Sequence, residues 1–294
     1  MAEARGGGGK RAVGRNAVRV ARPTGFCFGV ERAIRLAREG QRRFGRIVTL
    51  GEVVHNPQVL SELESEGIRA VSSPRQAGKV GALVIRAHGC PPDVLETCAG
   101  LGIRIIDATC PYVRKVQSVA RRLKEGGYAV VVVGERDHPE VRSILGYCGR
   151  PGMVYTPGRR VRAEKIGVVA QTTMSRERLR LAVADLSRFR YTELRVFDTI
   201  CEEVTARQDA AAKIAADSEL VIVVGGRSSA NTSRLAEIAA EAGARILHVE
   251  SVSELDRGRL AGVGHIGVIA GSSTPAWVVR EVARFARNPS QGGP

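Results

Sequence analysis

Residues 103–134 read IRIIDATCPYVRKVQSVARRLKEGGYAVVVVG, and this stretch decides the fold. Its first residues, 103–106, predict a short strand that ends just before Cys110. Residues 113–127 carry apolar side chains at spacings of three and four and close on glycine, which predicts an amphipathic helix. The apolar run 128–133 then predicts a buried strand. Strand, helix and strand in this order are typical of a parallel βαβ unit.

The same order occurs three times in the chain. Cys110 has counterparts in Cys27, 83 residues earlier, and in Cys201, 91 residues later. Each cysteine follows a short apolar strand and precedes a helical segment. The residues that stand 24, 28 and 30 positions after each cysteine are Gly51, Gly134 and Gly225; His55, His138 and Ser229; and Pro57, Glu140 and Asn231.

This internal repeat predicts an α/β protein built from three units related by a pseudo-threefold axis, each with its own parallel sheet. We expect the units at 17–110, 111–200 and 201–285, preceded by a flexible basic tail at 1–16 and followed by a C-terminal tail at 286–294. Ligands bind at the carboxyl ends of parallel strands. Three such edges facing a common axis would enclose one central pocket.

The composition of the 294-residue chain sets limits on its function. Hydrophobic residues make up 44% and charged residues 26%, as in a soluble globular protein, and no apolar run is long enough for a membrane helix. The sequence shows no secretory signal, so we expect a cytoplasmic protein with reduced cysteines. The net charge of +15 favours anionic ligands or partners. A nucleic-acid-binding protein is a weaker hypothesis, because aromatic residues are only 4% and the arginines are dispersed.

Three converging cysteines allow several interpretations. They could bind zinc together with a fourth ligand, or an iron–sulfur cube with one iron left open, or they could be inert core residues. Because each precedes a helix, we expect the helix dipole to lower the thiol pKa. The other three cysteines, Cys90, Cys98 and Cys148, lie outside the repeat and are expected in the core.

Polar residues at the predicted strand ends suggest a second chemical role. His55, His88 and His138 stand in glycine- or proline-rich segments and together indicate a shared anion site. The RSSANTS and AGSSTP segments offer hydroxyl groups, an amide and backbone N–H groups, which suit phosphate. Glu140 is the carboxyl group at the repeated position, where a general acid is plausible.

Nine motifs in this order resemble the 4-hydroxy-3-methylbut-2-enyl diphosphate reductase family, from about Pro23 to Val282. The motifs are GFCFGVERAI, GEVVHNP, AHGCPP, DATCPYVRKVQ, HPEV, AQTTMS, FDTICEEVTARQ, SSANTSRL and AGSSTP. The resemblance implies a trefoil of three α/β units around a central cluster. It also implies that Cys27, Cys110 and Cys201 hold one [4Fe-4S] cluster whose fourth iron is open to the substrate.

The resemblance further implies roles for individual residues. Glu140 would be the proton source, Thr172 a relay to the substrate hydroxyl, and His138 would assist both catalysis and binding. The other residues expected to hold the diphosphate are His55, His88, Ser229, Ala230, Asn231 and Ser273. Ala230 replaces the serine or glycine that is frequent in the family, so only its backbone N–H could contribute.

The implied reaction is the reductive removal of the hydroxyl group from an allylic diphosphate, which gives isopentenyl and dimethylallyl diphosphate. Electrons would come from an acidic donor such as a ferredoxin or flavodoxin, with no membrane or nucleic acid involved. A different three-cysteine cluster enzyme, resembling quinolinate synthase, is an alternative that shares the trefoil but lacks the HNP, AHG and HPE motifs.

Overall fold

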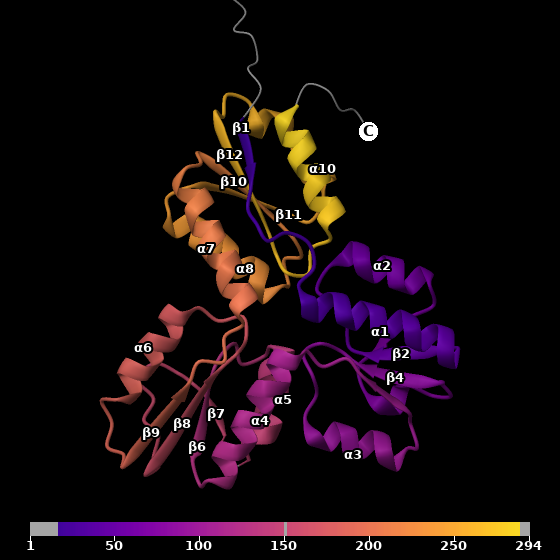
Figure 1. The fold of residues 1–294 in the computed structure, drawn as a ribbon, viewed down its shortest axis with the longest axis vertical. Coiled ribbons are helices and arrows are strands. Elements are labelled where there is room, and N and C mark those ends of the chain that lie inside the picture. Colours follow the sequence, from indigo (N-terminus) through magenta and orange to yellow (C-terminus); the bar gives the residue numbers. More distant parts are fainter. Residues whose placement is uncertain (1–16, 150–151, 289–294) are drawn as a thin grey trace, which may run out of the picture.

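The computed structural model describes residues 17–149 and 152–288 and has three lobes around a common centre (Figure 1). Each lobe contains one four-stranded sheet in which every pairing is parallel. The α/β class, the parallel sheets and the trefoil arrangement that the sequence predicts are therefore confirmed.

The first lobe follows the predicted alternation of strands and helices, with its strands in the order β3-β2-β4-β5. Its elements are α1 (Phe28–Phe44), β2 (Ile47–Leu50), α2 (Pro57–Ser65), β3 (Arg69–Val71), a 3₁₀ turn (Pro74–Gln76), β4 (Ala82–Ile85), α3 (Pro92–Gly100) and β5 (Ile105–Asp107).

The second lobe repeats this plan with the strand order β7-β6-β8-β9. Its elements are α4 (Pro111–Glu125), β6 (Ala129–Val133), α5 (Pro139–Cys148), β7 (Met153–Val154), β8 (Lys165–Ala170), α6 (Arg176–Leu186) and β9 (Glu193–Phe197).

The third lobe has the strand order β1-β12-β10-β11. This is the same arrangement taken from the opposite edge, so that β1 corresponds to β5 and β9 and β11 corresponds to β3 and β7. Its elements are β1 (Ala17–Val20), α7 (Glu202–Ala216), β10 (Leu220–Val224), α8 (Ala230–Glu241), β11 (Arg245–Val249), a 3₁₀ turn (Val252–Glu254), α9 (Arg257–Leu260), β12 (His265–Ala270) and α10 (Ala276–Arg287).

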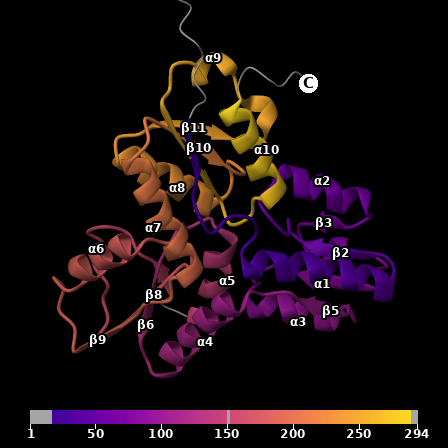
Figure 2. The same ribbon diagram turned by 45° about the horizontal axis from the view of Figure 1, so that its top comes forward.

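The placement of β1 corrects the sequence prediction. Residues 17–20 were assigned to the first unit (17–110), but β1 pairs with β12 in the third sheet, with Val18 opposite Ile266. Figures 1 and 2 both show the indigo start of the chain against the last lobe. The reason is the repeat itself: β5 and β9 complete the sheets that precede Cys110 and Cys201, and β1 occupies the same position before Cys27.

The two predicted tails also need comment. Helix α10 continues to Arg287, so the segment 286–294 begins within a helix rather than as a tail. The basic tail predicted at 1–16 and residues 289–294 lie outside the described residues.

Each sheet is covered by helices on both faces. Six clusters of buried apolar residues occur in the described chain, two for each sheet. All five residues of β6 and of β10 are buried, as expected for the central strands of parallel sheets. Cys90, Cys98 and Cys148 lie in these clusters, which confirms the core assignment made from sequence.

No helix within residues 17–149 and 152–288 is both long and apolar enough to cross a membrane.

Candidate functional site

Cys27, Cys110 and Cys201 occupy equivalent positions in the three lobes. Each is the N-cap residue of a helix, α1, α4 or α7. Each also donates its backbone N–H to the carbonyl oxygen of the second residue after a neighbouring strand. The pairs are Cys27 with Ser272 at 2.9 Å, Cys110 with Ala87 at 2.9 Å, and Cys201 with Thr172 at 3.0 Å. Each cysteine therefore lies at the start of a helix and beside the carboxyl end of a strand.

Gly29 shows how close two of the sulfurs come to one point. A Cβ atom placed on Gly29 would lie 2.8 Å from the Sγ of Cys110 and 3.9 Å from the Sγ of Cys27. Any side chain there would fill the space in front of both sulfurs. Cys201 lies near the same point, because a negative charge on its sulfur, like one on Cys27, raises the pKa of the Cys110 thiol.

The spacing of these sulfurs fits a group larger than a single ion. The three sulfurs are not among the described side chains whose ligand atoms all lie within 4.8 Å of one another. One zinc ion binds each sulfur at roughly 2.3 Å, which would bring the sulfurs closer together than this. A cube of iron and sulfide, held by one thiolate at each of three corners, suits a wider set of sulfurs. The space left by Gly29 and the choice of donor atoms fit such a group.

The pKa of these thiols differs from the expectation. Burial raises the pKa of Cys27 and Cys201, and raises that of Cys110 to about 11. Backbone N–H groups in the first helical turns lower all three values, as predicted, but the cost of desolvating a thiolate is larger. Burial therefore favours the protonated thiols, and coordination to a metal would favour the thiolates.

Glu140 and Thr172 form a buried pair beside the cysteines. Only 1% of Glu140 is exposed. One carboxylate oxygen accepts the backbone N–H of Thr172 at 2.6 Å, and the other accepts the Thr172 hydroxyl at 2.8 Å. Burial raises the pKa of Glu140 to about 7, although both hydrogen bonds act to lower it. A carboxyl group with such a pKa can hold a proton near neutral pH and release it, as a general acid must.

His55, His88 and His138 come from three different segments and meet at the centre. Their ring centroids are 5.2 to 6.2 Å apart. Burial is the main cause of a lowered pKa in all three, to about 4 for His138. Both ring nitrogens of His55 and the Nδ1 of His88 are buried without a hydrogen-bond partner. Glu52 comes within 3.4 Å of the His55 Nδ1 but lacks hydrogen-bond geometry.

Such a cluster could hold either a cation or an anion, and Arg86 distinguishes the two. One ring nitrogen from each histidine lies within 4.8 Å of the others, which is close enough for a metal ion. However, the positive charge of Arg86 helps to lower the pKa of each of the three imidazoles. A guanidinium group close enough to affect these rings repels a cation and attracts an anion. The surroundings of the histidines thus favour the anion site that the sequence indicates.

The amino end of α8 supplies further groups without partners. Ser229 caps the helix by accepting the Thr232 N–H, and Ala230 is its first residue. The amide of Asn231 is only 3% exposed, yet neither its nitrogen nor its oxygen has a partner. An unsatisfied buried amide is costly, and such groups in a native fold usually await a ligand or water.

These groups share one centre with the histidines. A Cβ on Gly226, three residues before the cap, would lie 2.2 Å from the His55 carbonyl oxygen, so the α8 loop touches the histidine loop. From the other side, Ser273 directs its hydroxyl at the same carbonyl oxygen at 3.4 Å. The backbone N–H of Glu140 donates to the Nδ1 of His138 at 3.2 Å, which joins the acid to this group.

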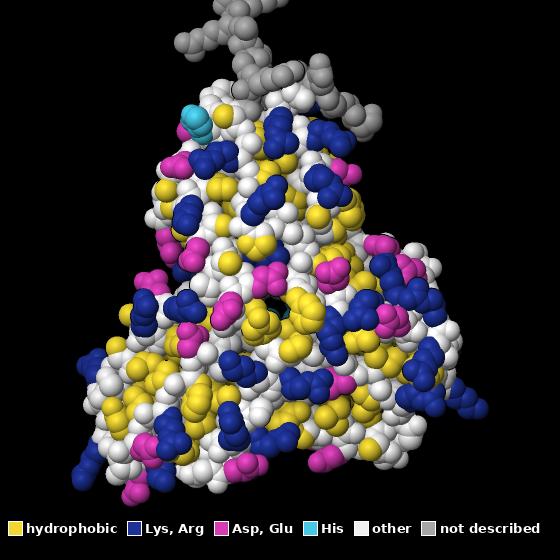
Figure 3. All heavy atoms as spheres, viewed as in Figure 1, with side chains coloured by type: hydrophobic (Ala, Val, Ile, Leu, Met, Phe, Trp, Pro, Cys, Tyr) yellow, Lys and Arg dark blue, Asp and Glu magenta, His cyan; other side chains and the backbone are white. Residues whose placement is uncertain are grey.

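The structure therefore brings every residue singled out from the sequence to the meeting point of the lobes. Figure 3 shows a small opening at this point, bordered by hydrophobic and acidic side chains. Phe28 and Tyr112, in the first turns that follow Cys27 and Cys110, are 57% and 38% exposed.

Two arginines lie at the site although the sequence indicates only that the arginines are dispersed along the chain. Arg86 is one, and its position two residues before His88 in the AHG motif was the available signal. The other is Arg207, whose side chain is 2% exposed. It donates to the carbonyl oxygens of Pro23 and Gly25 and to Glu203, which fixes the loop before Cys27 onto α7.

Several known proteins are similar to this chain over most of its length. The model of the LytB protein family matches residues 18–287. A 4-hydroxy-3-methylbut-2-enyl diphosphate reductase from Geobacter sulfurreducens is 43% identical over 267 residues, which cover 90% of this chain and 94% of the relative. The corresponding reductase from Syntrophotalea carbinolica is 42% identical, with 88% and 94% covered.

Two solved structures resemble the whole chain. One is (E)-4-hydroxy-3-methyl-but-2-enyl diphosphate reductase, described as the terminal enzyme of the non-mevalonate pathway, with 37% identity and a TM-score of 0.68 over 92% of this chain and 98% of that one. The other is the reductase from Plasmodium falciparum, with 27% identity and a TM-score of 0.88 over 94% and 89%.

Proposed function

Because the chain belongs to the LytB family, we propose that it removes the hydroxyl group of 4-hydroxy-3-methylbut-2-enyl diphosphate by reduction. The chain is an oxidoreductase of the non-mevalonate route to isoprenoids, and the family to which it belongs is iron–sulfur dependent. The products of this reaction are isopentenyl and dimethylallyl diphosphate. The alternative that resembles quinolinate synthase has no support from these relatives.

We assign the cofactor to Cys27, Cys110 and Cys201. A [4Fe-4S] cluster bound there would supply single electrons and one open iron for the substrate hydroxyl. The equivalent N-cap positions of the three cysteines and the space left by Gly29 support this assignment. Arg207 keeps the Cys27 loop against the helix that begins after Cys201.

The diphosphate would be bound by the groups that lack partners in the free protein. These are the imidazoles of His55 and His88 and the amide of Asn231, with Ser229, Ser273, the Ala230 N–H and His138 beside them. Arg86 would add positive charge from behind the histidines. The approach of a dianion would raise the pKa of the imidazoles, so that neutral rings become charged donors.

Glu140 and Thr172 would deliver the proton that lets the hydroxyl leave as water. Glu140 holds that proton on a carboxyl group whose pKa is about 7. Thr172 accepts it through the hydroxyl that lies 2.8 Å from the carboxylate and passes it to the substrate. Because the pair is buried, bulk water does not compete for this proton.

The electron donor is proposed from charge alone. A net charge of +15 suits an acidic carrier such as a ferredoxin or flavodoxin. We propose no nucleic-acid partner, and we expect the protein to act in the cytoplasm.

The proposal depends most on one observation, the meeting of three helix-capping cysteines with a buried, protonatable Glu140. Its test is anaerobic purification followed by iron analysis and electron paramagnetic resonance. Cys110→Ser should lose most of the bound iron and the activity. Cys98→Ala is the matched control, since Cys98 is fully buried in the core and should leave both unchanged. Full activity of an iron-free preparation would contradict the proposal.

A further inference from the structure

A groove on the third lobe has the features of a second ligand site. It lies between β1 with the segment that follows it and helix α10, and its volume is about 920 Å³. This volume is within the range of small-molecule sites. None of the candidate catalytic, cluster or diphosphate residues lines it.

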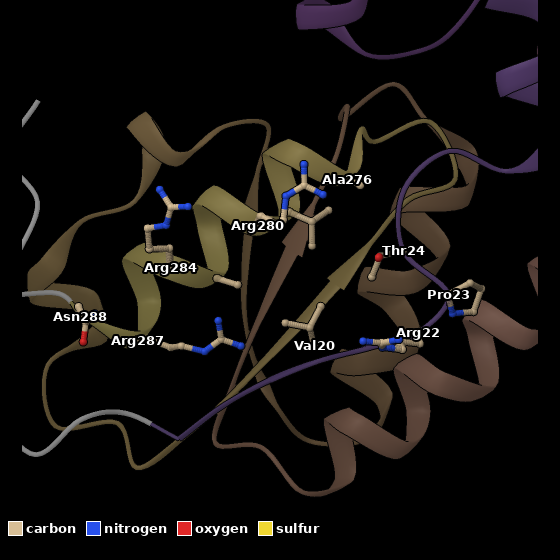
Figure 4. Close-up of a pocket in the computed structure, with 11 residues that line it drawn as sticks. Val20, Arg22, Pro23, Thr24, Ala276, Arg280, Arg284, Arg287 and Asn288 are labelled. Atoms are coloured by element: carbon tan, nitrogen blue, oxygen red, sulfur yellow. The ribbon is translucent and has the colours of Figure 1, made fainter.

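Four arginines surround the groove without an acidic partner. Arg280, Arg284 and Arg287 come from α10, and Arg22 comes from the opposite wall. None of the four has an ion pair or side-chain hydrogen bond within the described chain, and none of the described residues that line the groove is acidic. In Figure 4, Arg22 and Arg287 extend toward each other with Val20 between them.

A purely structural role does not account for this arrangement. Arginines in the last turn of a helix complement its dipole, which would explain Arg284 and Arg287. It does not explain Arg280, which lies in the middle of α10, or Arg22, which is outside any helix. Positions 280, 284 and 287 share one helix face, and like charges at such spacings destabilise a helix. An anion in the groove would remove this repulsion.

The walls between the arginines are apolar. Val20 and Pro23 contribute hydrocarbon surface to the groove, and Val279 and Ala283, which are almost fully buried, also line it. Guanidinium groups bind phosphate oxygens in a bidentate manner, while the apolar wall suits a hydrocarbon group attached to the phosphate.

We propose that this groove binds an organic phosphate or diphosphate that carries an apolar group, at a site separate from the active centre. The binding would be electrostatic at the arginines and hydrophobic at the wall. It would therefore weaken with salt but not disappear.

The test uses full-length protein, purified anaerobically, and n-octyl diphosphate as the probe in isothermal titration calorimetry. The wild type should show two binding events, one in the groove and one at the diphosphate residues of the active centre. Arg280→Gln/Arg287→Gln should lose the groove event or weaken it about tenfold or more. The control, Arg75→Gln/Arg160→Gln, removes the same charge from exposed arginines elsewhere and should keep both events.

A second variant separates this proposal from the proposed function. Asn231→Ala should weaken only the event at the active centre. Trp277, the single tryptophan, is 44% exposed beside Ala276 and provides an independent fluorescence signal for the groove. Two unchanged events in the Arg280→Gln/Arg287→Gln protein, or only one event that Asn231→Ala abolishes, would overturn the groove site.

Two further probes test the nature of the ligand. Inorganic pyrophosphate should bind the groove more weakly than n-octyl diphosphate, and equal affinity would contradict a role for the apolar wall. A single-stranded RNA homopolymer that binds through Arg280 and Arg287, with no groove event for n-octyl diphosphate, would assign the groove to nucleic acid and overturn the proposal.

Discussion

Glu140 shows how a single environment can set a residue's chemistry. An exposed glutamate is ionised at neutral pH, whereas here burial raises the pKa to about 7. Thr172 opposes this shift, because its two hydrogen bonds to the carboxylate lower the pKa of Glu140. The pKa is thus the balance between burial and these two bonds. A residue placed in this way can act as an acid at the pH of the cell.

Replacing Glu140 should separate binding from turnover. Glu140→Gln keeps the shape and removes the proton, so kcat should fall by two orders of magnitude or more while KM changes little. The exposed Glu177→Gln is the control. In Thr172→Val the proposed relay is lost, so kcat should fall as well. Loss of the hydroxyl should also raise the pKa of Glu140 further and shift the alkaline limb of the remaining pH–rate profile to higher pH, and Thr172→Ser should restore both the rate and the profile. An unchanged rate in Glu140→Gln would remove the residue from this role.

The same pKa predicts how stability depends on pH. Because the pKa in the folded protein is higher than in the unfolded chain, Glu140 stabilises the fold while it is protonated. This contribution is present below the usual glutamate pKa and is lost as the pH rises through about 7. The lowered pKa values of His55, His88 and His138 act in the opposite direction, because these rings destabilise the fold as the pH falls below the usual histidine pKa. The Glu140 contribution is therefore measured as the difference in the free energy of unfolding between metal-free wild type and Glu140→Gln. Chemical denaturation should show that this difference falls by up to about 3 kcal/mol between pH 5 and pH 8.

At this scale the sequence predicts the polar residues better than the charged ones. Cysteines and histidines are scarce, so their repeated spacing stands out and their meeting point could be predicted. Arginines are abundant, and nothing in the local sequence of Arg207 reveals that it is buried. For half-buried Arg86 the one signal is its place directly before the AHG motif. Their burial depends on loops from other segments that cover them, such as the Pro23–Gly25 loop over Arg207.

At the scale of single elements, α1 illustrates a conflict between helix stability and function. Gly29 lies in its first turn, where alanine would be the better helix former by about 1 kcal/mol. Yet a Cβ atom there would lie 2.8 Å from the Cys110 sulfur. The glycine therefore keeps space in front of the sulfurs at a cost to the helix.

Gly29→Ala should lower the iron content sharply without unfolding the protein. The melting temperature of the metal-free form should change little, because the gain in helix propensity offsets the displacement of Cys110. Gly100→Ala is the matched control, a helical glycine in α3 with no neighbour within 4 Å of the added Cβ. It should leave the iron content unchanged. Equal iron content in the two variants, measured by colorimetric assay, would show that the space is not needed.

The sequence predicts strands well where both faces of the sheet are covered by helices. The apolar run 128–133, predicted as a buried strand, forms β6 (Ala129–Val133). It is apolar throughout, like β10, because both faces of each sheet are covered. The thiol pKa was predicted in the wrong direction, because the helix dipole can be read from sequence whereas the depth of burial cannot.

At the scale of the whole molecule, β1 closes a ring of three lobes. Its pairing with β12 links the first residues described to the last sheet. This pairing was not predicted, because β1 is followed directly by the first lobe, and neighbours in sequence usually belong to the same unit. The threefold repeat contained the answer, since a strand before each cysteine completes the preceding sheet.

Removing β1 should destabilise the third lobe, because β12 would lose its neighbouring strand. A chain that begins at Ala21 loses the strand and the half-buried Val18 and Val20, which should lower the stability of the third lobe by about 2–4 kcal/mol. A chain that begins at Ala17 is the control and should behave like the full protein. Hydrogen exchange in residues 265–270 should be faster only in the shorter chain. Equal protection in the two forms would show that β1 does not hold the sheet together.

The ring also has a consequence for the order of events at the ribosome. Strand β1 leaves the ribosome long before its partner β12. The third lobe thus cannot be completed until β12 has been made, whereas the first two lobes can fold earlier. The Cys27 N–H donates to the carbonyl oxygen of Ser272, which follows β12, so Cys27 also reaches its final place only then. The three proposed cluster ligands therefore come together late in synthesis.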